Sequence, residues 1–162
     1  MRILYILPYI PIPVNSGNKN LIYNLLKFAS KEFEIDIMII DSFCDKESIN
    51  KLLRKDFPEI RNIFLYRKNN SFNLFFYKLF FLLRGLPPIL GNFFRLDIFN
   101  WLKINQFSYD LIHFDMWYCA PYNKVIKNIP KILVPSDAYS LSANLAIKET
   151  KNLRKIYTNI YK

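Results

Sequence analysis

The chain has 162 residues, of which 52% are hydrophobic and 22% are charged, and its formal net charge is +10. This composition excludes a disordered chain, and the length fits one domain with its own core. No apolar run reaches the roughly 18 residues that span a bilayer, and residues 3–7 are too short a run for a signal peptide. The two cysteines have no CxxC or metal spacing, so we expect a reduced, cytoplasmic protein.

Short apolar runs alternate with amphipathic segments along most of the chain. Residues 3–7 form a fully apolar run, typical of a buried parallel strand, and residues 19–30 carry apolar side chains at helical spacing. The same alternation predicts strands at 34–40, 62–66, 109–114 and 131–134, and helices at 46–56 and 120–127. We therefore predict an α/β fold, a Rossmann-like three-layer domain with a mainly parallel sheet flanked by helices.

One segment, residues 72–105, breaks this alternation and reads as a helical excursion. Its pattern predicts an apolar helix at 72–83, a proline-bearing turn at 85–91 and an amphipathic helix at 93–104. A long basic helical stretch is expected at 139–162. Without internal repeats or a linker, residues 1–162 are expected to form a single domain.

A proline-rich loop after the first strand reaches Ser16 and Gly17 just before the first predicted helix. In an open parallel sheet, ligands bind past the carboxyl ends of the strands, where helix N-termini offer free N–H groups to phosphates. Gly17 would let such a ligand approach the backbone, although the loop lacks the GxGxxG spacing of a dinucleotide site. The alternative is an ordinary turn in which Gly17 adopts a positive φ.

The order of these features resembles the N-terminal part of family 4 glycosyltransferases of the GT-B fold. The first strand, the glycine loop, the helix and KEFEIDIMIID match the family's opening, except that Glu32-Phe33 stands where Gly-His is usual. YDLIHFDMWYCAPY is similar to the family's fourth-strand segment, and IPKILVPSDAYSL to its fifth strand and following turn. LLRGLPPILGNFF is similar to its helical excursion, so the resemblance covers essentially the whole chain.

The resemblance implies the acceptor-side half of a GT-B enzyme. The second half, which binds most of the donor, is expected to be absent after Lys162. The implied reaction moves a hexose from a nucleotide-diphosphate sugar to a glycan or lipid-linked acceptor with retention at the anomeric carbon. This domain would be inactive alone and would need a donor domain, which a separate chain could supply. Neither a metal nor any other cofactor is expected.

The resemblance also assigns the candidate site residues. Ser16, Gly17 and Asn18 would approach the donor diphosphate, and the acceptor side would be lined by Asp115, Trp117, Tyr118 and the candidate catalytic residues His113, Ser136 and Asp137. Ser136 stands where many members have a histidine, and serine can donate a hydrogen bond but cannot replace a histidine in proton transfer. Asp137 matches an acidic residue of the family, or it is the N-cap of a helix that begins at Ala138.

The residues at the end of the fourth strand have both functional and structural interpretations. His113 is the only histidine, and its ordinary pKa of roughly 6.5 suits proton transfer or a hydrogen bond to a sugar hydroxyl. Alternatively, local backbone groups satisfy it. Trp117 and Tyr118 either stack on a sugar ring or close the core.

The basic charge by itself does not choose between nucleic acid, anionic lipid and phosphorylated ligands. The segment at 72–84 combines aromatic residues and leucines with Lys78 and Arg84, so it could contact the inner face of a membrane peripherally. Alternatively it is buried in the core or against a partner. The basic stretch at 148–162 has no aromatic platform, and we expect no nucleic-acid binding.

Two other classes of function remain open. One is a non-catalytic binding or scaffolding domain, either a remnant or half of a split enzyme, which should expose an apolar patch where its partner docks. The other is a different Rossmann-like binder of phosphorylated ligands, against which the missing GxGxxG and Walker motifs speak.

Overall fold

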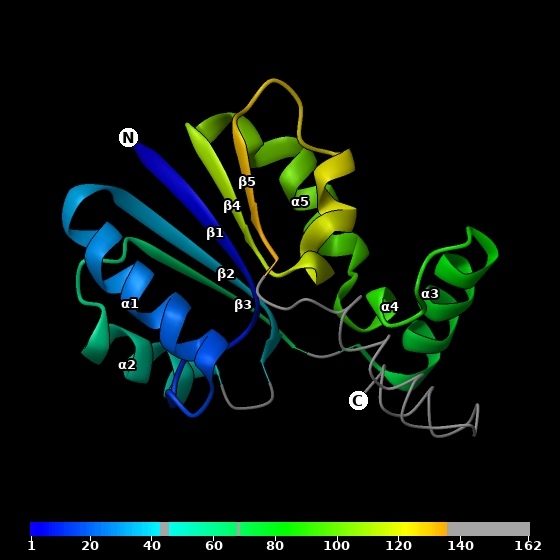
Figure 1. Cartoon of the computed structure of the whole chain (residues 1–162), viewed down its shortest axis with the longest axis horizontal. Coiled ribbons are helices and arrows are strands. Elements are labelled where there is room, and N and C mark those ends of the chain that lie inside the picture. Colours follow the sequence, from blue (N-terminus) through cyan, green and yellow to red (C-terminus); the bar gives the residue numbers. More distant parts are fainter. Residues whose placement is uncertain (43–45, 68, 136–162) are drawn as a thin grey trace, which may run out of the picture.

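The computed structural model of the chain describes residues 1–42, 46–67 and 69–135. The five strands in these residues are all parallel and lie in the order β3-β2-β1-β4-β5, with β1 at the centre (Figure 1). The strands are β1 (Arg2–Tyr9), β2 (Glu34–Ser42), β3 (Asn62–Arg67), β4 (Leu111–Asp115) and β5 (Lys131–Val134). Helices cover both faces of the sheet, so the predicted α/β, Rossmann-like three-layer fold is confirmed.

Helices α1 (Gly17–Glu32) and α2 (Lys46–Asp56) cover one face of the sheet (Figure 1). Alternate residues of a strand project to opposite faces, so Tyr5 and Leu7 of β1 meet this helical layer. The buried side chains of the layer are Ile22 and Leu26 of α1 and Ile49 and Leu53 of α2. The members of each pair are four positions apart, which is a spacing that places side chains on one side of a helix.

The opposite face is covered by α5 (Leu96–Asn105), the short 3-10 helix η1 (Gln106–Ser108) and the 3-10 helix η2 (Trp117–Lys124). Leu4 and Ile6 of β1 pack here with Ile98, Leu102 and Tyr122. The central strand therefore has a buried face on each side, which explains why its sequence is a continuous apolar run rather than an alternating one.

The helix predicted at 93–104 is wrong in its first part, because the chain is extended at Phe94 and Arg95. The four-residue helix α4 (Leu90–Phe93) lies before this break and overlaps the end of the predicted turn, and α5 lies after it. The buried hydroxyl of Tyr122 explains the break, since it donates to the Phe93 carbonyl at 2.8 Å and accepts from the Arg95 N–H at 2.9 Å. A tertiary contact thus replaces the helical hydrogen bonds that the local pattern favours.

The helix predicted at 120–127 is also displaced, because η2 begins immediately after β4 and is a 3-10 helix. The Cys119 N–H donates to the Met116 carbonyl at 3.1 Å, and the Val125 N–H donates to the Tyr122 carbonyl at 3.2 Å. Pro121 lies inside the element and has no N–H to give to a regular α-helical ladder.

The helix α3 (Ser71–Leu83) confirms the apolar helix predicted within the excursion. It begins where the Asn70 side chain accepts from the Asn73 N–H at 2.8 Å, and it ends before Gly85, which has a φ of +68°. In Figure 1, α3 stands to the right of the sheet and packs on α4, which in turn packs on η2. A Cβ on Gly91 of α4 would lie 2.7 Å from the backbone nitrogen of Lys78, so glycine permits this close approach.

A charged cluster closes the amino edge of the sheet. Asp36 of β2 is fully buried and accepts hydrogen bonds from Arg2 at 2.7 Å and from the Tyr109 hydroxyl at 2.8 Å. The backbone N–H and the side-chain amide of Asn62 donate to its other oxygen at 3.1 and 3.0 Å. Both carboxylate oxygens are thus satisfied, as a buried charge requires.

Among the described residues, no helix has the length and apolar character needed to cross a membrane. The helical stretch predicted at 139–162 lies outside the described residues.

Candidate functional site

The amino end of α1 is exposed and has a well-formed cap. Ser16 is the N-cap in an extended conformation, and its hydroxyl oxygen accepts from the Lys19 N–H at 3.4 Å. The first turn contains no acidic residue and includes Lys19. The partial positive charge of the helix end is therefore not cancelled locally, which favours an anion near this end.

Gly17, the first residue of α1, has no structural requirement for glycine within the described residues. Its φ does not lie in the left-handed region, and a Cβ added there would have no described atom within 4 Å. The alternative of a turn that needs a positive φ at Gly17 is therefore wrong. What glycine does provide is an exposed backbone that a ligand can approach closely.

His113 lies in β4, on the face of the sheet that α1 covers, and is 4% exposed. Its ring lies 4.5 Å from that of Tyr5, its register partner in β1. Burial lowers its pKa to about 4, so the imidazole is neutral at physiological pH. Its Nδ1 atom is buried and has no hydrogen-bond partner among the described residues. The alternative in which local backbone groups satisfy the histidine does not hold for this nitrogen among the described residues.

Asp115 ends β4 and is buried, and its carbonyl accepts a hydrogen bond from the Cys119 thiol at 3.2 Å. The next residue, Met116, has a φ of 69° and a ψ of 149°, a conformation that costs a residue with a side chain of order 1–3 kcal/mol. The Tyr9 hydroxyl donates to the Met116 sulfur at 2.8 Å, and the Met116 N–H donates to the Val134 carbonyl at 2.9 Å. Neighbouring strands thus hold a strained residue where β4 ends.

The two aromatic residues that follow have different surroundings. Tyr118 is buried and stacks on Phe93 of α4, with ring centroids 4.5 Å apart and an interplanar angle of 19°. Trp117 is half-buried, and its ring lies 4.5 Å from that of Tyr118. Tyr118 therefore closes the core between η2 and α4, whereas Trp117 retains accessible surface.

Most of the predicted site residues come to one edge of the sheet. β4 is the neighbour of β1 and β5, and parallel strands place their carboxyl ends together. The turn after β4, with Asp115 and Trp117, therefore lies at the edge from which the β1–α1 loop departs to Ser16 and Gly17. His113 lies two residues before this edge. Ser136 and Asp137 lie outside the described residues.

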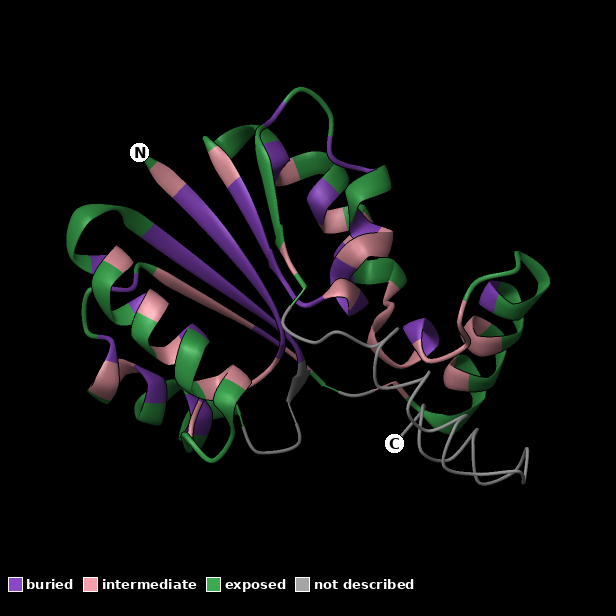
Figure 2. Cartoon of the chain, in the orientation of Figure 1, coloured by how far each residue is buried: buried purple, intermediate pink, exposed green. Residues whose placement is uncertain are grey.

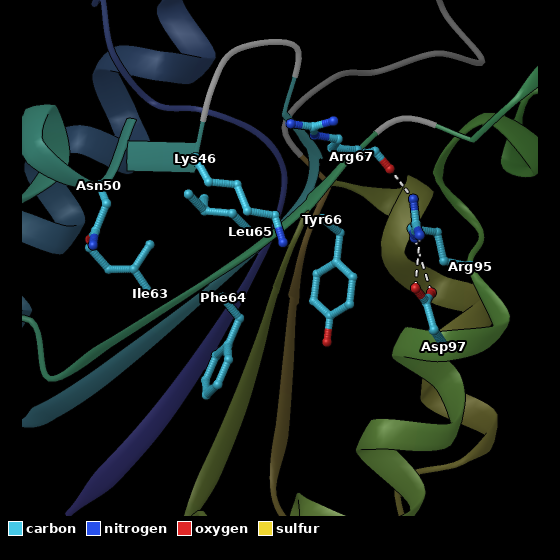
Figure 3. Close-up of a pocket in the computed structure, with 9 residues that line it drawn as sticks. All are labelled: Lys46, Asn50, Ile63, Phe64, Leu65, Tyr66, Arg67, Arg95 and Asp97. Carbon is cyan, nitrogen blue, oxygen red and sulfur yellow. Dashed lines mark hydrogen bonds and ion pairs between the residues drawn. The ribbon is translucent and has the colours of Figure 1, made fainter. Parts of the chain in front are cut away.

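A separate open cavity of about 860 Å³ lies along the edge strand β3 (Figure 3). Lys46 and Asn50 of α2 line one side and Tyr66 of β3 lines the middle, while the Arg95–Asp97 ion pair, 2.7 Å long, stands opposite. The Arg95 guanidinium also donates to the Arg67 carbonyl. None of the predicted site residues lines this cavity.

Sequence reasoning missed Met116 and the cavity along β3. A methionine carries no signal for a positive φ, because side chains oppose that conformation and only the tertiary contacts impose it. The charged residues that line the cavity come from three separate segments, so no local sequence motif predicts it. Asp97, the acidic residue in the first turn of α5, is one lining residue that a helix-start pattern could have singled out.

The carboxyl edge can bind an anion at α1 and form hydrogen bonds through a neutral imidazole. The described residues contain no group of three or more His, Cys, Asp or Glu side chains placed to hold a metal ion. No family model, no curated protein and no solved structure matches the chain. The structure therefore establishes the fold, whereas the resemblance to family 4 glycosyltransferases stays a prediction.

Proposed function

We propose that the chain is the N-terminal, acceptor-side domain of a GT-B glycosyltransferase similar to family 4. One observation carries this proposal: the open glycine at the exposed N-terminus of α1 belongs to the same sheet edge as the residues that end β4. A diphosphate that approaches Gly17 would meet backbone N–H groups and a partial positive charge with no acidic residue nearby in the helix. A nucleotide-diphosphate sugar presents this group.

The proposed reaction transfers a hexose to a hydroxyl of a glycan or lipid-linked acceptor with retention. Ser16, Gly17 and Asn18 bind the donor diphosphate and stabilise the negative charge that grows on it as the sugar departs. A donor domain, in a longer form of the chain or in a separate one, holds the nucleotide. The domain described here is accordingly inactive alone.

His113 acts in this proposal as a hydrogen-bonding residue. With a pKa of about 4 it carries no proton to donate as an acid at neutral pH, and as a base it is weak. Its buried Nδ1 can position a group that reaches the end of β4, and the partly accessible ring of Trp117 offers a face for a sugar. Asp115 completes the acceptor side, and Ser136 and Asp137 remain candidates by resemblance.

The second candidate is half of a split enzyme or a non-catalytic scaffold. The observation in its favour is the edge strand β5, where the side chains of Ile132 and Leu133 are each 44% exposed on opposite faces. Such a strand can pair with or pack against another chain. This candidate predicts binding of a partner chain without sugar transfer.

The location that fits the proposed reaction is the cytoplasm, at the inner face of a membrane that carries the acceptor. The helix α3 supports this placement, since Phe72, Phe75 and Leu83 are all more than half exposed on it. Contact of residues 72–84 with the bilayer would be peripheral.

The test is calorimetric titration of the chain with UDP, GDP and their hexose conjugates, alone and with any donor domain encoded nearby. We expect binding, or sugar transfer, that depends on the donor domain and falls at least tenfold in Gly17→Val, because the new side chain blocks the approach to the helix end. The control is Asn24→Val, which places the same side chain at an exposed position of the same helix.

The open space at Gly17 makes this experiment informative, since the folded chain accommodates the new side chain. Equal unfolding temperatures for the two variants would show that any loss is a loss of binding. Nucleotide binding that Gly17→Val leaves intact would remove the diphosphate assignment. Absence of binding and transfer in every combination would favour the scaffold.

A further inference from the structure

An apolar groove of about 690 Å³ is lined by residues of α3, of the segment at 86–99 and of η2. Phe80 of α3, Phe94 and Phe99 line it together with Ala120 of η2, and Phe81 of α3, which also lines it, packs edge-on against Phe94 with ring centroids 5.5 Å apart. The volume is within the range of sites that hold small ligands. Aromatic and aliphatic side chains supply most of the lining, so the groove suits an apolar hydrocarbon chain.

The walls of the groove are held in place by specific contacts. Gly91 lets α4 approach the backbone of α3, where a Cβ would lie 2.7 Å from the Lys78 nitrogen. The Tyr122 hydroxyl fixes the chain on both sides of Phe94, through the Phe93 carbonyl and the Arg95 N–H. The groove is therefore part of the folded structure and not a gap between loosely attached segments.

All the charge on the groove lining is positive. Arg84 and Lys124 are the charged residues that line it, and no acidic residue does so among the described ones. The Arg84 guanidinium lies 4.2 Å from the centre of the Phe80 ring, a cation–π contact that leaves its N–H donors available at the rim. An apolar groove with a cationic rim is complementary to an apolar chain that ends in an anionic group.

The groove is continuous with an exposed apolar surface on α3. Phe76 and Phe80 line the groove and are also 49% and 41% exposed, and the outer side chains Phe72 and Phe75 are 70% and 62% exposed. Figure 2 shows α3 mostly in the colours of exposed and intermediate residues, and Phe81 is its buried residue. α3 contains no acidic residue and one cation, Lys78. Aromatic residues beside cations are typical of a surface that lies at the headgroup level of a bilayer.

We propose that α3 docks on an anionic bilayer and that the groove takes one chain of a lipid with a phosphate headgroup. The acyl chain lies against the apolar lining that includes Phe80, Phe99 and Ala120, and the phosphate meets Arg84 and Lys124. This lipid binding needs no nucleotide and no donor domain. A chain that fails to bind lipid could therefore still transfer sugar, and a chain that fails to transfer sugar could still bind lipid.

The docking surface is tested by sedimentation of the full chain with phosphatidylcholine vesicles that contain about 30 mol% phosphatidylglycerol. Replacement of both rim cations, in Arg84→Gln with Lys124→Gln, should weaken binding by about 20- to 30-fold, since each cation near an anionic surface contributes about fivefold. The matched control is Lys27→Gln with Lys51→Gln, which removes equal charge from exposed positions of α1 and α2. Equal losses in the two pairs would show a general charge effect and overturn the proposal.

The groove is tested separately with lysophosphatidylglycerol, which has one chain, titrated below its micelle concentration. We expect one lipid molecule to bind per protein molecule. Ala120→Trp should weaken this binding at least tenfold, because the new ring fills the groove. Asn24→Trp, which adds the same ring at an exposed position of α1, should leave it unchanged.

Other occupants predict different results in the same experiments. If another part of the chain or a second copy fills the groove, Ala120→Trp lowers the unfolding temperature or changes the oligomeric state, and lysophosphatidylglycerol does not bind to the original chain. If α3 docks on a protein, Phe75→Ser leaves vesicle binding unchanged. Either result would overturn the proposal.

Discussion

The two edges of the same sheet are built differently. At the amino edge, the buried carboxylate of Asp36 has hydrogen-bond donors on both oxygens, from Arg2, Tyr109 and Asn62. At the carboxyl edge, Met116 has a strained backbone, and the Nδ1 atom of the nearby His113 is buried without a partner among the described residues. The amino edge thus has a fully satisfied carboxylate, although the buried Nε of Arg2 has no hydrogen-bond partner among the described residues, whereas the carboxyl edge combines backbone strain with a buried imidazole nitrogen that has no partner there.

This difference indicates that the amino edge of the sheet mainly stabilises the fold, whereas the carboxyl edge is the place for a functional site. A satisfied buried network holds strands together, and its residues act on each other rather than on a ligand. Strain and an unpaired buried donor or acceptor cost free energy in the folded chain, and such costs are concentrated at functional sites. The carboxyl edge is accordingly where we place the site, as is usual for open parallel sheets.

The largest expected effect is at the amino edge. Asp36→Ala should lower the free energy of unfolding by about 3–5 kcal/mol, because it removes the acceptor of the buried Tyr109 hydroxyl, of the Asn62 N–H and amide, and of the partly exposed Arg2 guanidinium. Urea unfolding measures this loss. Glu34→Ala is the control, since its ion pair with Arg61 is exposed and should contribute less than about 1 kcal/mol. Similar losses in the two variants would show that the Asp36 network is not a structural anchor.

The second effect concerns the pH dependence of stability at the carboxyl edge. The folded pKa of His113 is about 4, below its ordinary value of about 6.5, so between these values the unfolded chain binds a proton that the folded chain does not. The free energy of unfolding should therefore rise with pH across this window, by up to about 3 kcal/mol. This contribution of His113 is complete above about pH 6.5 and is lost as the pH falls toward 4. Urea titrations of the original chain and of His113→Phe measure it. A slope that persists in His113→Phe would assign it to other groups.

The smallest effect isolates the strain at Met116. Met116→Ala and Met116→Gly remove the same side-chain contacts, but only glycine adopts a φ of 69° without cost. We expect Met116→Gly to be the more stable of the two variants by about 1 kcal/mol, the strain relief being partly offset by the greater freedom of glycine in the unfolded chain. Thermal unfolding of the pair is sufficient. An alanine variant of equal or greater stability would contradict the strained conformation.

Much of the fold was predictable because it rests on local patterns. Apolar runs and helical spacing placed all five described strands, together with α1, α2 and α3, within a few residues of their bounds. The pattern failed where a distant side chain competes with local hydrogen bonds, as the Tyr122 hydroxyl does on both sides of Phe94. It failed again after β4, where the conformation of Met116 lets η2 begin at once.

The candidate site was predictable only as a set of positions. Parallel strands put the ends of β1 and β4 at one edge, so the sequence indicated that Gly17 and Asp115 belong there. It did not indicate that His113 would be buried beside Tyr5 with a lowered pKa, because burial depends on what packs over a strand. Nor could it separate Tyr118, which packs in the core, from Trp117, which keeps accessible surface.

The sequence by itself determined the layered α/β architecture and the apolar character of α3, because periodicity and composition are properties of neighbouring residues. Only the tertiary structure decided the cluster at Asp36, the strain at Met116 and the groove between α3 and α5. Each of these depends on groups far apart in the chain, and their free energies arise only when folding brings those groups together.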